Sequence, residues 1–128
     1  MARSPISISG GVIAVPVSDD TTALTTGTGK YTFRMPFAAT ITAVRSEVIT
    51  APTGATAIVD INVTGVGTIL STKLSIDAGE KTSVTAASPA VISVASVADD
   101  AEVTLDIDQV GSTIAGAGLK VYIYVTPA

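Results

Sequence analysis

The largest group of acidic side chains, and the first candidate for metal chemistry, lies in residues 99–108, where Asp106 and Asp108 begin the segment DIDQVG. An EF-hand calcium loop needs a glycine at its sixth position and a bidentate glutamate at its twelfth. Counted from Asp106, Gly111 fits the sixth position, but Ala117 stands at the twelfth. The flanking segments also have strand patterns instead of helical ones. We therefore interpret the two aspartates as the solvated face of a strand, with a cation site between subunits as the alternative.

The chain contains few of the residue types that enzymes commonly use for catalysis. The chain contains no histidine, the commonest general base, and no cysteine nucleophile. Serine is abundant, but the GxSxG motif of a nucleophile elbow is absent. Carboxylates such as Asp60 and Asp106 could meet across two strands, as they do in most β-sandwiches. The sequence predicts a protein that is not an enzyme and that needs no cofactor.

The glycine-rich segment GSTIAGAG, Gly111–Gly118, is a second motif that could do chemistry. A phosphate-binding loop needs a Gly-Lys-Ser/Thr sequence at the start of a helix. Here Lys120 lies inside a strand pattern and no helical pattern follows. The segment therefore predicts a flexible hairpin loop between the strands on either side, and a symmetric partner could approach its glycines closely.

Tyr122 and Tyr124 form the third candidate site. They alternate with Val121 and Ile123 in the last strand pattern, and so they share the opposite face with Lys120. A pair of exposed tyrosines could stack on a sugar or contact a protein partner. The interpretation that we favour is that this face packs inside the sandwich or is covered by a neighbouring subunit.

These candidate residues must be positioned by strands, because apolar residues alternate with period two along most of the chain. Turn signals at intervals of about 8–12 residues separate the strands, which is typical of a sandwich or barrel. We therefore predict an all-β fold, an antiparallel, jelly-roll-like β-sandwich of about eight strands. The strand patterns cover Val12–Val17, Lys30–Phe37, Ala39–Thr50, Ala57–Val63, Leu70–Ile76, Thr82–Ala86, Ala90–Val94, Glu102–Asp108 and Leu119–Val125.

The N-terminal segment differs from the rest of the chain. Pro5 resists regular structure and Gly10-Gly11 can act as a hinge. We therefore divide the chain into an arm, residues 1–11, and a β-sandwich domain, residues 12–128. The arm is expected to extend and to dock on a neighbouring subunit. The candidate partner-binding residues are Arg3, Pro5, Ile6, Ile8, Tyr122 and Tyr124.

Charge and composition exclude some partners. The net charge is −4 and the seven basic residues are scattered, which argues against binding to nucleic acid. No apolar run reaches the roughly 18 residues of a transmembrane helix, and the N-terminus lacks the apolar region of a secretory signal. Only 14% of the residues are charged. This low value favours a surface partly covered by neighbouring subunits over the plain Thr/Ser-rich surface of a monomer.

Three segments carry a resemblance to a known group of proteins: GKYTFRMPFAATITAVR, STKLSIDAGEKTS and DIDQVGSTIAGAGLKV. They resemble a module that is common in structural proteins of tailed-bacteriophage virions, and the similarity covers nearly the whole chain from Val12 onward. The resemblance implies a small β-sandwich that assembles as a trimer. It carries no catalytic residues to transfer to this chain.

The resemblance also implies a location in the virion, assembled in the cytoplasm of the bacterial host. We expect a capsid decoration or cement protein, a homotrimer that binds the major capsid protein on the head surface. A single domain without shaft repeats suits this role. The alternative is a tail fibre or appendage protein that binds a glycan receptor on the host.

Overall fold

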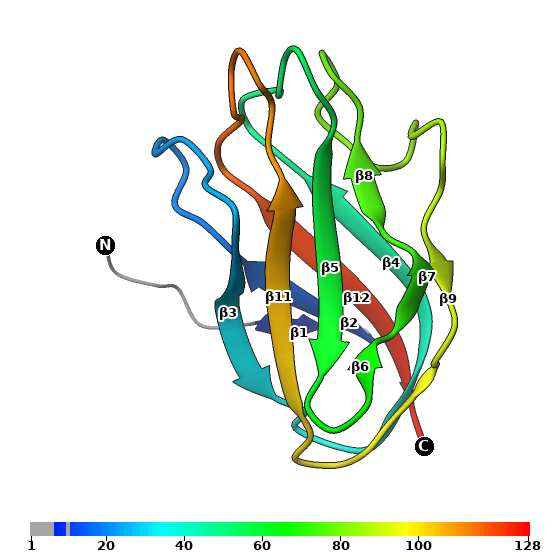
Figure 1. The fold of residues 1–128 in the computed structure, drawn as a ribbon. Coiled ribbons are helices and arrows are strands. Elements are labelled where there is room, and N and C mark those ends of the chain that lie inside the picture. The colour runs from blue at the N-terminus through cyan, green and yellow to red at the C-terminus, as the bar shows by residue number, and fades with distance from the viewer. Residues whose placement is uncertain (1–6, 10) are drawn as a thin grey trace.

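The structure of the chain, a computed structural model, describes residues 7–9 and 11–128, and these residues form strands and loops without a helix (Figure 1). No helix in this part of the chain has the length and apolar character required to span a bilayer. The strands are β1 (Ser7–Ser9), β2 (Val12–Pro16), β3 (Gly27–Arg34), β4 (Ala39–Glu47), β5 (Ala57–Val63), β6 (Gly67–Thr68), β7 (Leu70–Thr72), β8 (Leu74–Ile76), β9 (Val91–Ile92), β10 (Ser96–Val97), β11 (Glu102–Gln109) and β12 (Lys120–Pro127). The predicted all-β fold class is confirmed.

The strands form two facing antiparallel sheets, and β7 and β9 pair in a separate two-stranded sheet. The first, called here the β12 sheet, has the order β1-β2-β12-β4-β10. The second, called here the β11 sheet, has the order β3-β11-β5, with the short strands β6 and β8 both paired to β5. The orders β2-β12-β4-β10 and β3-β11-β5-β8 are those of a jelly roll, in which the first and last of eight strands are neighbours in one sheet. The predicted jelly-roll-like sandwich is therefore confirmed.

The core lies between the two sheets and is built by alternate residues of each long strand. In β12, Val121, Ile123 and Val125 are at most 4% exposed, and β11 contributes an equivalent row. Fully burying one such side chain stabilises the fold by about 1.5–3 kcal/mol. The inward rows that the alternation predicts are confirmed for Tyr31, Phe33, Met35, Val59, Ile61, Val63, Val103, Leu105, Ile107, Leu119, Val121, Ile123 and Val125.

The predicted hairpin between the last two long strands is wrong. β11 pairs with β3 and β5, whereas β12 pairs with β2 and β4 in the opposite sheet. The chain between them crosses from one sheet to the other at the end of the sandwich where several long loops gather (Figure 1). Alternation shows which face of a strand is buried, but it does not show which strand is the neighbour.

Two further strand predictions need correction. The segment expected as one strand, Leu70–Ile76, is divided into β7 and β8, with Lys73 between them. The segment Thr82–Ala86 forms no strand and makes a single β-bridge, from Thr82 to Glu47 of β4. The first segment is divided because β7 pairs with β9 whereas β8 pairs with β5, so tertiary contacts decide its conformation.

Part of the predicted N-terminal arm lies in the β12 sheet. Ser7–Ser9 forms β1 and pairs with β2 of the same chain, so that Ile8 lies opposite Ile13 in the register. Three of the candidate partner-binding residues, Arg3, Pro5 and Ile6, lie outside the described residues. The docking of the arm on a neighbouring subunit stays a prediction.

Candidate interaction face on the β12 sheet

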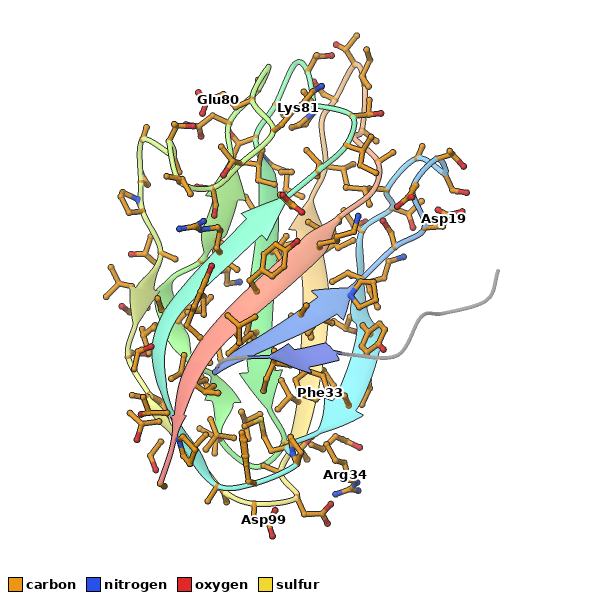
Figure 2. All side chains as sticks on the ribbon, turned by 180° about the vertical axis from the view of Figure 1, so that it is seen from behind. Asp19, Phe33, Arg34, Glu80, Lys81 and Asp99 are labelled. Carbon is orange, nitrogen blue, oxygen red and sulfur yellow. The ribbon has the colours of Figure 1, made fainter. Side chains whose placement is uncertain are left out.

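The outer face of the β12 sheet carries both candidate tyrosines. β12 lies between β2 and β4 near the middle of the sheet. Because its alternate residues point into the core, Tyr122 and Tyr124 lie on the outer face, where each is half-buried by its neighbours. Figure 2 looks onto this sheet, and no strand or loop crosses in front of β12. The interpretation that this face packs inside the sandwich is therefore wrong.

Small and apolar side chains surround the two tyrosines. In the register, Tyr122 lies between Ala14 of β2 and Arg45 of β4. Tyr124 lies between Val12 of β2 and Ala43 of β4 in the same way. Three of these four neighbours are therefore small or aliphatic.

The hydroxyl group of Tyr122 is bound within the same face. It donates a hydrogen bond to the Glu47 carboxylate, with 2.7 Å between the two oxygens. This hydrogen bond, followed by partial burial and the negative charge of Glu47, raises the pKa of Tyr122 above its ordinary value. Tyr122 is therefore neutral at physiological pH, and its polar end is already satisfied.

Arg45 is the second polar group of the face. Its guanidinium lies 5.7 Å from the centroid of the Tyr124 ring, within the range of a cation–π interaction. In the part of the chain that the structure describes, no carboxylate lies within ion-pair distance of Arg45. Arg45 and Glu47 were not among the predicted site residues. The alternation in the segment TAVRSEV places Arg45 and Glu47 on one face of a strand, but it does not show that this strand lies beside the tyrosines.

A groove continues this face on the far side of β4. It has a volume of about 540 Å³ and runs between β4 and the segment of residues 83–92. Two valines at its rim are exposed, Val84 by 61% and Val91 by 49%. Contiguous exposed apolar surface is suited to contact with a partner, and these two valines line the same groove. The sequence pattern missed the groove because residues 83–92 form it mainly as a loop.

The acidic candidates lie on the opposite side of the molecule, on the outer face of the β11 sheet. Asp106 accepts hydrogen bonds from the backbone amide of Gly29, at 2.8 Å, and from the Asn62 side chain, at 2.7 Å. Lys73 donates to Asp108 at 2.5 Å. The hydrogen bond to Asp108 is the main reason why the pKa of Lys73 is raised, against the opposing effect of burial. Lys73 thus supplies the positive charge beside these aspartates.

Asp60 and Asp106 meet across β5 and β11, where they are paired in the register. Asp60 is only 5% exposed, although it belongs to the outer row of β5. Its carboxylate accepts hydrogen bonds from Thr68 at 2.5 Å and from its neighbours in the chain, and Lys73 lies 3.7 Å away. Among residues 7–9 and 11–128, no three acidic, histidine or cysteine side chains are grouped so as to hold a metal ion. A cation between subunits near Asp106 and Asp108 stays a prediction.

The glycine-rich segment packs against its own chain. The Thr53 backbone amide donates a hydrogen bond to the Ile114 carbonyl, and the Thr53 carbonyl accepts one from the Thr113 amide. The backbone groups of Thr50 and Ala117 exchange two hydrogen bonds. A Cβ atom at Gly111 would collide with the carbonyl group of Ile114. The expected flexible loop that leaves room for a partner is therefore wrong for Gly111, because the close approach to this glycine comes from the chain's own backbone.

Comparison with family models, with curated proteins and with solved structures returned no significant match. The geometry is thus the main guide to function. It offers one weakly charged face with two tyrosines and an adjoining apolar groove. That the protein is not an enzyme stays a prediction, as does its lack of a cofactor.

Proposed function

We propose that this chain is a structural protein of a tailed-bacteriophage virion, and that it decorates the head as a homotrimer. In this role it binds the major capsid protein on the head surface and stabilises the shell. The observation that carries the proposal is a jelly-roll sandwich whose outer β12 face presents tyrosines and few charges, in a chain whose three segments resemble phage structural modules.

The physical support comes from the nature of the exposed groups. Tyrosine and arginine are enriched in protein interfaces, whereas lysine, glutamate and aspartate are depleted. The acidic groups on the opposite side are held by hydrogen bonds and by Lys73 within the chain. Jelly rolls recur in viral capsid proteins and in lectins, so this analogy supports the capsid role and the glycan-binding role equally.

The proposed mechanism is stabilisation by buried surface. One subunit that buries a standard interface on the shell covers about 1,200–2,000 Å² in total. A trimer makes three such contacts, so that the second and third bind at a high effective concentration. A shell bridged in this way resists expansion because several capsid subunits must separate together.

The proposal is tested by adding purified protein to phage heads that lack it and by counting the copies that sediment with the heads. Decoration of an icosahedral shell predicts saturation at on the order of hundreds of copies per head, in multiples set by the shell symmetry. It also predicts heads that withstand heating or osmotic shock better than undecorated heads. Binding confined to a few copies, or to tails only, would refute the decoration role.

The second candidate is a tail fibre or appendage protein that binds a host glycan. The specific observation in its favour is the pair of outward tyrosines, since aromatic rings stack on sugars. A glycan array separates the two functions. Sugar binding that is lost in Tyr122→Ala and Tyr124→Ala, with no binding to heads, would favour the glycan role.

A further inference from the structure

We infer that the outer face of the β12 sheet is the surface through which one copy of this chain binds a second copy. This inference rests on the proposed homotrimer and adds to it which surface forms the subunit contact. The face is centred on Tyr122 and Tyr124, flanked by Val12 and Ala14 on one side and by Ala43 on the other.

The two outer faces of the sandwich differ in character. On the β11 sheet, the outward row of β11 reads Glu102, Thr104, Asp106 and Asp108, and β3 adds Arg34 beside it. On the β12 sheet, small, aliphatic and aromatic residues occupy most of the equivalent positions. Because charged residues are depleted in the buried centre of an interface, the β12 sheet is the face suited to be covered.

Charge favours a second copy of the same chain as the occupant. The chain carries a net charge of −4, so two copies repel one another when acidic surfaces approach. On the β12 face, Arg45 and Glu47 have opposite charges, and the Nζ atom of Lys120 lies 3.4 Å from the Oδ1 atom of Asp20. These four charges sum to zero. Two copies can therefore meet here without the repulsion that the β11 face would impose.

The Tyr122 hydroxyl group can lose water at little cost. The Tyr122 hydroxyl keeps its hydrogen bond to Glu47 when the surface is covered, so no buried donor is left unpaired. The Arg45 guanidinium keeps its contact with the Tyr124 ring, a contact that strengthens when water is removed. Tyr122 therefore needs only shape and apolar area from the partner, whereas the guanidinium N–H groups of Arg45 need acceptor groups there.

The position of the tyrosines matches that of an interface hot spot. β12 has β2 on one side and β4 on the other, so both rings lie inside the face and not at its rim. Residues that dominate binding energy cluster at the centre of an interface, where surrounding contacts exclude water, and tyrosine and arginine are enriched among them.

A matched pair of arginine substitutions tests the inference. Ala14→Arg places a charge beside Tyr122 on the β12 face, and Thr104→Arg places one on the outer row of β11. Each protein is measured by sedimentation equilibrium, with circular dichroism as the check on folding. We expect wild-type trimers, Thr104→Arg trimers, and an association of Ala14→Arg weakened about 30-fold or more, the effect of losing an interface hot spot. Tyr124→Ser serves the same purpose if Ala14→Arg does not fold.

The outcomes separate this inference from the proposed function. A wild-type trimer that persists in the folded Ala14→Arg or Tyr124→Ser protein overturns the inference and leaves the homotrimer standing. A wild-type monomer at micromolar concentration overturns both. A variant that remains trimeric but no longer binds phage heads shows that this face docks on the shell, and it also overturns the inference.

Discussion

Replacing Ser46 by alanine is expected to stabilise the protein, which is unusual for a substitution in a core. Ser46 lies in the inward row of β4, opposite Val121, and is fully buried. Among the described residues, its hydroxyl group has no hydrogen-bond partner. Burying an unpaired hydroxyl group costs about 1–3 kcal/mol, and the alanine variant regains this stability. Because alanine is a poor strand former, about a few tenths of a kcal/mol of the gain is lost again. The net gain should be about 1 kcal/mol, or a rise in Tm of about 3–5 °C.

The assay is denaturant unfolding of wild type and Ser46→Ala, with thermal unfolding as a second measure. Ser83→Ala is the matched control, because the Ser83 hydroxyl accepts a hydrogen bond from the Ser46 backbone amide at 2.9 Å. Removing that acceptor should destabilise the protein by about 1 kcal/mol. The reasoning is refuted if Ser46→Ala lowers the free energy of unfolding by more than about 0.5 kcal/mol, since a loss of that size exceeds ordinary surface effects and means that the hydroxyl is bonded.

Three further predictions follow from the core, the crossing loop and the tyrosine face. Ile123→Asp buries an unpaired carboxylate and should abolish soluble folding, since the penalty of several kcal/mol approaches the whole stability of a small domain; a folded variant by circular dichroism would contradict this. Gly111→Ala should lower Tm more than Gly65→Ala, because a Cβ at Gly111 collides with backbone atoms, whereas at Gly65 it meets open space and adds only the strain of a φ of 85°, about 1–2 kcal/mol; equal shifts in a melting curve would contradict this. Glu47→Gln should lower the pKa of Tyr122, as read from tyrosinate absorbance, and an unchanged titration would count against the contact. Because the pKa of Tyr122 is raised in the folded state, the stability from the Tyr122–Glu47 contact is present below about pH 10 and is lost as pH rises through the folded pKa.

The faces of the long strands could be predicted because burial follows local alternation. Val103, Leu105 and Ile107 are all inward, and the intervening residues are outward, as the period of two requires. The same rule placed Tyr122 and Tyr124 on one face. It could not show whether that face looked inward to a second layer or outward.

Strand neighbours could not be predicted from the same pattern. The glycine-rich segment after β11 looked like a hairpin loop, but its backbone bonds with Thr50 and Thr53 hold it across the end of the sandwich. These contacts join residues about sixty positions apart, and no local feature of either segment encodes them. The alternation of β5 places Asp60 in its outer row, but it does not show the contacts that Thr68 and Lys73 make with its carboxylate.

The most direct test of the central claim is cryo-electron microscopy of the virion that contains this chain. The account predicts trimeric density on the outer surface of the head, repeated at three-fold or quasi-three-fold positions of the shell. The twisted sandwich should fit that density with its β12 sheets turned toward one another. Density for this chain at the tail tip alone, in a few copies, would contradict the decoration role and favour receptor binding.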